Sequence, residues 1–141
     1  MAISEVHAGR NYPATAPYQV SAAKIAEFAS ALGDDSSSYR GDDPIAPPTF
    51  IAVITTPAWE LMFDDPELEL ALPRIVHGDQ RFNYVRPLRA EDVVTGTLTI
   101  DKVRVRGAVE IISASVDVTT VEGEPICSAQ ATFLHSRSAA A

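Results

Sequence analysis

Residues 49–63, TFIAVITTPAWELMF, are apolar on nearly every side, and Glu60 is the only charged residue among them. A helix without a polar face has to be enclosed by the rest of the protein. Pro48 lies just before the stretch, where the first turn of a helix tolerates proline. Pro57 is expected to kink the helix or to divide it in two. The stretch therefore predicts a helix buried inside the fold.

Downstream of Pro73, apolar residues recur at every second position, which is the period of a β-strand. This pattern predicts strands within residues 80–87, 92–106, 109–120 and 126–134. The alternation slips by one position near Asp101, where we expect a β-bulge. Short turns at Gly107 and Gly123 favour antiparallel neighbours. With a short leading strand at residues 18–20, the sheet is expected to have about five strands.

A second helix is predicted upstream, over SAAKIAEFASALG, residues 21–33. Ser21 can cap its start, and Gly33 suits the position after its end. Its apolar stripe has the spacing i, i+3, i+4, i+7 and consists of Ile25, Phe28, Ala29 and Leu32. The helix is amphipathic and should lie on the surface.

One enclosed helix and one antiparallel sheet predict an α+β protein in which the sheet wraps around the helix, the hot-dog architecture. A sheet of this kind leaves an edge open, so we expect dimerisation by strand pairing. The 141 residues fit a single domain, residues 1–141, with residues 136–141 as a frayed tail.

The composition excludes several classes of protein. The net charge of −8 argues against a nucleic-acid partner, whose phosphates need a basic face. No apolar run is long enough to span a membrane, and the first residues lack the pattern of a secretory signal, so a cytoplasmic protein is predicted. The single cysteine, Cys127, and three scattered histidines lack metal-ligand spacing. We therefore expect no metal and no cofactor.

Basic residues nevertheless gather in one part of the sequence, at Arg74, Arg81, Arg86, Arg89, Lys102, Arg104 and Arg106. Such a group could hold a small anionic ligand. A solvated strand face is the other interpretation, and it is the commoner one.

Two segments carry a family resemblance: IAPPTF at residues 45–50 and HGDQRFNYVRP at residues 77–87. With the order of predicted elements, they resemble the MaoC-like hot-dog dehydratases, including the FAS1-like dehydratase domain. The chain is most similar to the actinobacterial branch that supplies the non-catalytic subunit of (3R)-hydroxyacyl thioester dehydratases. The resemblance covers about residues 8–134 and implies a role in fatty acid or mycolic acid synthesis.

The loop GDDSSSYRGDDPIAPPTF, residues 33–50, departs from the pattern of catalytic relatives. Their hydratase motif resembles Gly-Asp-x-Asn-Pro-apolar-His. Gly33 and Asp34 match its first two positions, but Tyr39 stands where the histidine should be. A histidine suits proton transfer because its pKa lies near working pH, whereas the pKa of a phenol lies near ~10.

A second departure lies at the start of the apolar helix. Catalytic relatives have a stretch like Ile-Ala-His-Gly-Met there, and the resemblance implies that the glycine N–H donates to the thioester oxygen. Pro48 occupies the glycine position and has no N–H. Losing one such donor commonly costs ~10²–10³ in rate.

The resemblance therefore gives two sets of candidate residues. Asp34 and Tyr39 occupy the catalytic positions and are expected to be vestigial. The candidate substrate-binding residues are Pro48, Thr49, Trp59 and Met62. Alternatives stay open, because Asp34 can be a turn residue, Tyr39 a packing residue, and Trp59 and Met62 parts of the core.

Three functions are compatible with this pattern. The leading hypothesis is a non-catalytic subunit that pairs with a catalytic MaoC-like partner and shapes a tunnel for the acyl chain of a coenzyme A or carrier-protein thioester. One alternative is a homodimer that binds an acyl thioester without converting it. The other is a divergent hot-dog dehydratase or thioesterase that uses Asp34 and Tyr39.

Overall fold

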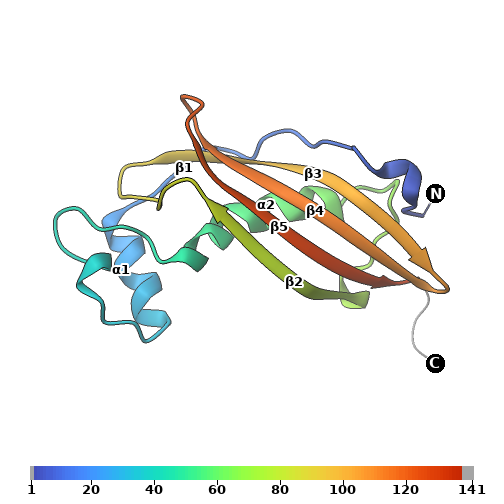
Figure 1. Ribbon diagram of the computed structural model, residues 1–141, viewed down its shortest axis with the longest axis horizontal. Helices are drawn as coiled ribbons and strands as arrows, with labels where there is room; N and C mark the ends of the chain where they lie inside the picture. The colour runs from blue at the N-terminus through green and yellow to red at the C-terminus, as the bar shows by residue number, and fades with distance from the viewer. Residues whose placement is uncertain (1, 138–141) are drawn as a thin grey trace.

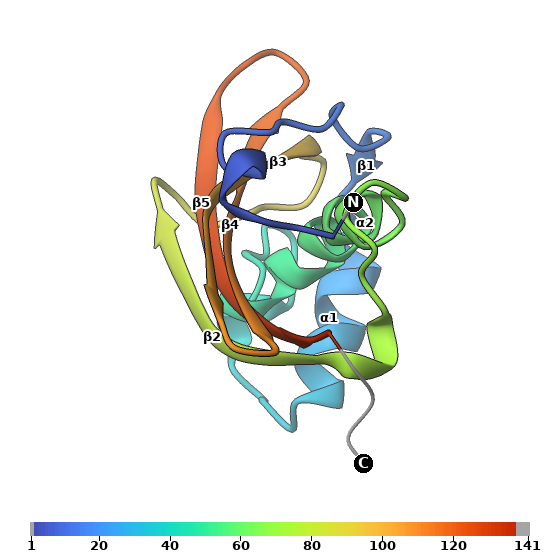
Figure 2. The same cartoon turned by 90° about the vertical axis from the view of Figure 1, so that its right-hand side faces the viewer.

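A computed structural model describes residues 2–137. A five-stranded antiparallel sheet curls around one long helix, so the predicted α+β hot-dog arrangement is confirmed (Figures 1 and 2). Among the described residues, no helix has the length and apolarity needed to cross a membrane.

The elements follow one another along the chain as short 3-10 turns (η), two α-helices and five strands. They are η1 (Glu5–His7), β1 (Tyr18–Gln19), α1 (Ala22–Ala31), η2 (Ser37–Tyr39), η3 (Pro48–Ile51), α2 (Ala52–Phe63), η4 (Leu72–Arg74), β2 (Ile75–Tyr84), β3 (Val93–Arg106), β4 (Val109–Thr120) and β5 (Pro125–Ser136). The order of strands across the sheet is β1-β3-β4-β5-β2.

Helix α2 is packed against the concave face of the sheet, as its apolar sequence predicts. Ala58 is completely buried. The helix comes close to the sheet at Gly96, where an added Cβ would lie 3.2 Å from a methyl group of Ile54. The helix is continuous through Pro57, so the predicted division there is wrong. Pro57 is exposed, where water can reach the backbone groups that a proline leaves unpaired.

Helix α1 covers one end of α2 (Figure 1). Ser21 caps it by accepting a hydrogen bond from the Lys24 N–H at 3.1 Å, and Gly33 has a φ of 74°, so both predicted helix signals are confirmed. The apolar stripe is shorter than predicted, because Leu32 lies beyond the last helical residue and is 56% exposed.

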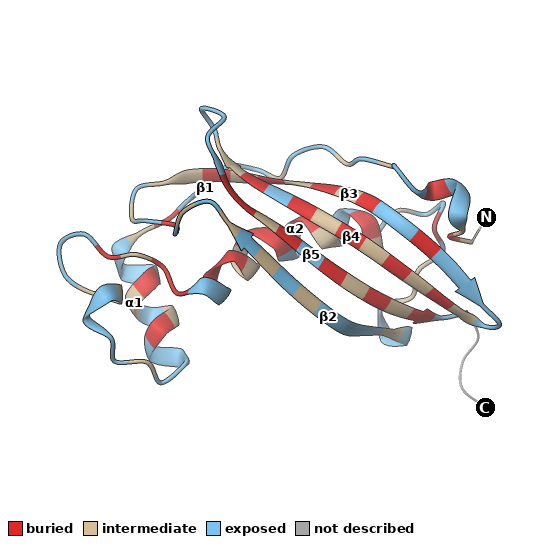
Figure 3. Cartoon of the chain, viewed as in Figure 1, coloured by how far each residue is buried: buried red, intermediate tan, exposed pale blue. Residues whose placement is uncertain are grey.

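The strands β3, β4 and β5 alternate between buried and half-buried residues (Figure 3). The register of β3 against β4 shifts between Ile100 and Lys102, which confirms the predicted bulge near Asp101. The prediction of a frayed tail over residues 136–141 is wrong for its first two residues. Ser136 belongs to β5, and the Arg137 N–H donates to the Ala108 carbonyl at 2.8 Å. Residues 138–141 lie outside the described residues.

The two edges of the sheet differ. The N-terminal segment covers the β3 edge, where the N–H groups of Gly9, Tyr12 and Thr15 donate to β3 carbonyls at 2.6, 3.0 and 2.9 Å. At the opposite edge, no described strand pairs with the outer side of β2. An unpaired edge is a template for another strand.

Candidate functional site

A cavity of about 250 Å³ lies where the loop of residues 33–47 meets the start of the central helix. Its lining is almost entirely apolar and comes from three parts of the chain: Tyr39, Ile45, Ala46, Pro48, Tyr84 and Pro87. The cavity thus lies at the position to which the sequence assigned the active site of catalytic relatives.

Backbone hydrogen bonds hold the walls of the cavity together. The Ala46 N–H donates to the Leu88 carbonyl at 2.8 Å, which ties the loop to the connection between β2 and β3. The Tyr84 hydroxyl donates to the Pro48 carbonyl at the head of the helix. Burial raises the pKa of Tyr84 above its usual value, so this phenol stays protonated at neutral pH.

Asp34 is a turn residue in this structure. Its carboxylate accepts a hydrogen bond from the Ser36 N–H at 3.0 Å, and it is not among the residues that line the cavity. The guanidinium of Arg40 donates to the carbonyls of Asp34 and Ser36, both at 2.9 Å, and to the Ser30 hydroxyl at 3.1 Å. These bonds keep the loop folded against α1.

The other predicted site residues are divided between the cavity, the surface and the core. Tyr39 and Pro48 line the cavity. Thr49 is exposed beside Pro48 but is not a lining residue. Met62 is completely buried and belongs to the hydrophobic core, which is the alternative that the sequence left open.

Trp59 lies on the side of α2 that is closest to β2. Its ring makes edge-to-face contacts with His77 and Phe133, with ring centroids 5.2 and 5.3 Å apart. The Trp59 indole nitrogen is buried and has no hydrogen-bond partner among the described residues, and the same holds for the hydroxyl of Thr55 one turn earlier. His77 bonds Gln80 at 3.1 Å, which agrees with a structural histidine.

A strip of half-buried side chains runs beside the open edge of the sheet. It consists of Ala52, Trp59 and Phe63 on α2 and of Phe82 and Tyr84 on β2, and is called the α2–β2 strip below. The three helical residues share one face by their spacing. Phe82 and Tyr84 pair with the buried residues Ala129 and Cys127 and therefore point to the concave face. The strip leads away from the cavity along the helix.

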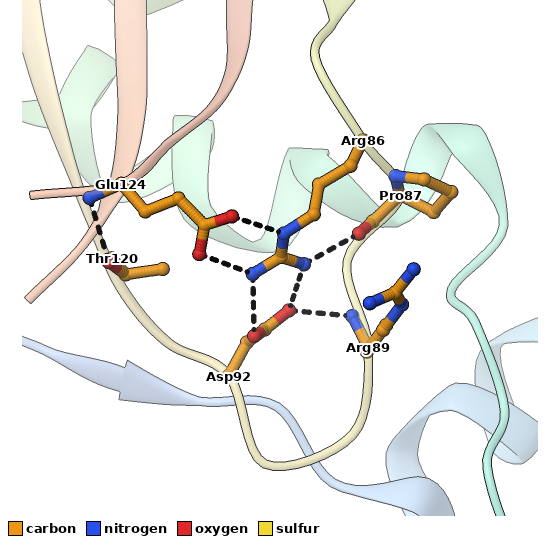
Figure 4. A network of polar contacts seen from close by, with 6 residues as sticks. All are labelled: Arg86, Pro87, Arg89, Asp92, Thr120 and Glu124. Atoms are coloured by element: carbon orange, nitrogen blue, oxygen red, sulfur yellow. Dashed lines mark hydrogen bonds and ion pairs between the residues drawn. The ribbon is translucent and has the colours of Figure 1, made fainter.

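Arg86 organises the loop that supplies Pro87 to the cavity (Figure 4). Its guanidinium donates to both oxygens of Asp92 at 2.9 and 3.0 Å and to both oxygens of Glu124 at 2.8 and 3.1 Å. A further bond reaches the Pro87 carbonyl at 2.9 Å. Two carboxylates thus neutralise Arg86, which removes it from the group of cations proposed for an anionic ligand.

The remaining basic residues do not form one group either. Arg74 and Arg86 flank opposite ends of β2, a ten-residue strand, and are therefore separated by about 30 Å or more of extended chain. Lys102, Arg104 and Arg106 are exposed residues of β3. For these residues, the structure thus favours a solvated strand face over a site for an anionic ligand.

A buried polar cluster escaped the sequence analysis. Glu110 and His135 are 1% and 2% exposed, and a nitrogen of the His135 ring lies 2.7 Å from the Glu110 carboxylate. The two residues are 25 positions apart and become neighbours only through the pairing of β4 with β5. Each lies two residues from a buried residue of its predicted strand, Glu110 before Ile112 and His135 after Phe133, and this was the only available signal.

Cys127 is buried, and burial raises the pKa of its thiol to about 11. A thiol in this state is a poor nucleophile at neutral pH. Within residues 2–137, no three histidine, cysteine or acidic side chains form a group that could hold a metal ion.

Comparisons with known proteins agree with this geometry. The family described as FAS1-like, dehydratase domain region matches residues 6–129. A UPF0336 protein of Cutibacterium acnes is 50% identical over 97% of this chain and 96% of its own length. A UPF0336 protein of Streptomyces coelicolor is 41% identical over 92% of each chain.

Solved structures share the fold at lower sequence identity. The HadBC (3R)-hydroxyacyl-ACP dehydratase complex of Mycobacterium tuberculosis has a TM-score of 0.79 at 24% identity, over 91% of this chain and 96% of the matched one. A MaoC-like dehydratase has a TM-score of 0.83 at 20% identity, over 94% of this chain and 43% of the other. The ChsH1–ChsH2 complex of M. tuberculosis has a TM-score of 0.65 at 17% identity, over 91% and 86%.

Proposed function

This chain belongs to the FAS1-like, dehydratase domain region family, and on that premise we propose that it is a non-catalytic subunit of a (3R)-hydroxyacyl thioester dehydratase. It pairs with a catalytic MaoC-like chain and helps to hold the acyl chain of the substrate. One observation carries the proposal: the cavity at the start of the helix is lined by apolar groups and two tyrosines, without a histidine or carboxylate among its described lining residues.

Dehydration of a β-hydroxyacyl thioester needs a base for the α-proton and an acid for the departing hydroxyl. Tyr39 and Tyr84 are the only titratable residues among the described lining residues, and an ordinary phenol has a pKa near ~10. Burial makes Tyr84 a still weaker acid. Pro48 has no N–H to donate to a thioester oxygen. The cavity is therefore suited to contact a substrate and poorly suited to transform it.

The open edge of the sheet supports the pairing. Strand β2 has ten residues and no described strand beside its outer side. On the β3 edge, by contrast, Lys102, Arg104 and Arg106 follow the segment covered by the N-terminus, and charged residues discourage strand addition. Two of the structural neighbours are heteromeric complexes by name, HadBC and ChsH1–ChsH2. We therefore assign β2 to the contact with the partner.

The α2–β2 strip supports the assignment of an acyl ligand. Its aromatic side chains are half-buried and lie next to the strand that the partner is proposed to cover. A partner seated on β2 would enclose the strip and turn it into an apolar path that begins at the cavity. The ligand is accordingly an acyl chain on coenzyme A or a carrier protein, in fatty acid or mycolic acid synthesis in the cytoplasm.

The test is reconstitution with a chain from the same organism that carries the intact Asp and His motif. Co-expression should give an equimolar complex that hydrates trans-2-enoyl thioesters, while this chain alone should be inactive. Turnover by this chain alone that Asp34→Asn abolishes would show an enzyme instead. If no motif-bearing chain binds, the homodimeric acyl-binding protein replaces the subunit.

A further inference from the structure

A cluster of buried polar groups lies at the end of the sheet that is farthest from the cavity. Ala71, in the connection between α2 and β2, donates its N–H to Nε2 of His135 at 3.0 Å. Nε2 is therefore an acceptor, so a neutral His135 carries its proton on Nδ1 and donates it to Glu110, 2.7 Å away. Arg137 donates to the second oxygen of Glu110 at 3.0 Å. These four residues are called the clasp below.

The clasp fixes a specific piece of backbone. The connection of residues 64–74 leaves α2 after Phe63 and leads into β2 (Figure 1). Its first half is tied to the N-terminal segment, because Arg10 and Tyr12 bond Asp65 at 2.8 and 2.6 Å. In its second half, the clasp holds Ala71, and Arg74 donates to the Arg137 carbonyl at 2.8 Å.

Burying a carboxylate and an imidazole is costly unless each is fully paired. Glu110 and His135 achieve this only with the Ala71 N–H and Arg137 in place. The backbone at Ala71 is therefore held in one position, across the end of the α2–β2 strip where Phe63 packs against Phe133 at 5.2 Å. The distance along the helix from the cavity to this point, from Pro48 to Phe63, is about 22 Å at ~1.5 Å per residue.

We propose that the clasp is an end-stop, which holds the connection across the far end of the strip and so sets the longest acyl chain that the subunit accepts. This inference rests on the proposed function, since it assumes that an acyl chain lies along the strip. A distance of about 22 Å, which is 15 residues at ~1.5 Å each, is in the range of an extended long-chain acyl group. Opening the clasp releases only the second half of the connection, because Asp65 stays tied to the N-terminus.

The sequence provides a reporter for this proposal. Trp59 is its single tryptophan and lies in the middle of the strip. Its fluorescence can be followed while the full chain is titrated with acyl-coenzyme A probes from octanoyl to hexacosanoyl. For the native chain, the affinity is expected to increase with acyl length and then to stop increasing at a limiting length.

His135→Phe keeps the ring but removes the acceptor for the Ala71 N–H. The limiting length should move to longer chains by at least one step of the series, and exchange of the Ala71 amide hydrogen should become roughly tenfold faster. His135→Gln can still accept from Ala71 and donate to Glu110, so it should restore the native limit. Asp101→Asn alters an exposed carboxylate of β3 that belongs neither to the clasp nor to the cavity, and should leave the limit unchanged.

A second variant keeps the test valid if His135→Phe does not fold. Ala71→Leu keeps the N–H and adds bulk at the stop, so the limiting length should become shorter. An unchanged limit in either folded variant overturns the end-stop, as does native-like exchange at Ala71 in His135→Phe. If Trp59 responds to no probe in the chain alone and the reconstituted complex binds no acyl probe either, the acyl-binding function and this inference are overturned together.

Discussion

Tyr39 and Pro48 together determine the chemistry of the cavity. By the resemblance to catalytic relatives, the phenol of Tyr39 stands at the position of a general base, and Pro48 replaces the residue whose N–H would stabilise an oxyanion. The carboxylate of Asp34, which is retained from the motif together with Gly33, accepts a hydrogen bond from the Ser36 N–H. These three features support the proposal of a non-catalytic subunit.

Restoring only one of these features should not restore activity. Tyr39→His supplies a base near neutral pKa, but Pro48 still cannot donate a hydrogen bond, and the missing donor alone costs ~10²–10³ in rate. The purified variant is therefore expected to show no hydration of enoyl thioesters in a spectrophotometric assay. Tyr39→Phe, which replaces the same residue without supplying a base, is the matched control. Substantial turnover by Tyr39→His would mean that the site is intact apart from one residue.

Asp92 gives a prediction about pH. Its burial acts to raise its pKa, but hydrogen bonds from Arg86 and from the Arg89 N–H outweigh burial, so the pKa lies below the usual value. A lowered pKa in the folded state adds stability above the unfolded value, and this contribution is lost as the pH falls through the folded value.

Asp92→Asn should therefore lower the free energy of unfolding by about 1–2 kcal/mol at neutral pH, since it removes charge-assisted hydrogen bonds. The difference from the native chain should shrink below pH ~4. Urea unfolding at neutral and acidic pH measures both values. Asp101→Asn, which changes an exposed aspartate bonded to Ser115, is the control and should have little effect at either pH. If Asp92→Asn lowers the free energy of unfolding by the same amount at neutral and acidic pH, the charge of Asp92 does not have the proposed role.

At the scale of elements, helix α2 has one face that packs on the sheet and an adjacent face that belongs to the α2–β2 strip. One face packs on the sheet through completely buried residues such as Ala58 and Met62. The adjacent face contributes Ala52, Trp59 and Phe63 to the α2–β2 strip. Substitutions that alter ligand contacts belong on the second face, because enlarging a residue of the first would overpack the core.

Ala52→Phe should obstruct the strip next to the cavity. Long acyl-coenzyme A probes are expected to bind more weakly, as measured by Trp59 fluorescence, while thermal unfolding should change little because Ala52 is only half-buried. Ala52→Ser, which hardly changes the volume, is the control. Equal binding by both variants would exclude the strip as the path of the acyl chain.

The open strand β2 should make the purified chain at least a dimer. Val76 is a 63% exposed residue of this strand, and Val76→Lys places a charge on the edge, which opposes strand pairing. Sedimentation at micromolar concentration should show weaker association for this variant than for the native chain. Val121→Lys, at a 55% exposed position in the turn between β4 and β5, should associate normally. A native monomer would contradict the interface.

The sequence predicted the elements better than their contacts. The buried helix followed from its lack of a polar face, and the bulge near Asp101 followed from a slip in the alternation of the strand. The start of β2 at Ile75 was missed, because polar residues and a bulge between His77 and Asp79 interrupt the alternation. Likewise, Tyr84 and Pro87 reach the cavity from a distant segment, and only tertiary pairing brings them to Pro48.

At the scale of the whole molecule, the described residues form one core between the sheet and α2, with both terminal segments tied to the connection of residues 64–74. The N-terminal segment also closes the β3 edge. We therefore propose β2 and the strip beside it as the surface for a second chain. The division of labour proposed here follows from this surface and from the lack of a base in the cavity.

The most direct test of that division is to substitute the motif positions of one chain at a time in the reconstituted complex. Hydration of enoyl thioesters is measured with Asp34→Asn and Tyr39→Phe in this chain, and separately with the motif histidine of the catalytic partner replaced. The first complex should keep the native rate, whereas the second should lose ~10²-fold or more, the usual contribution of a general base. A comparable loss in the first complex would contradict the account, because it would place the chemistry in this chain.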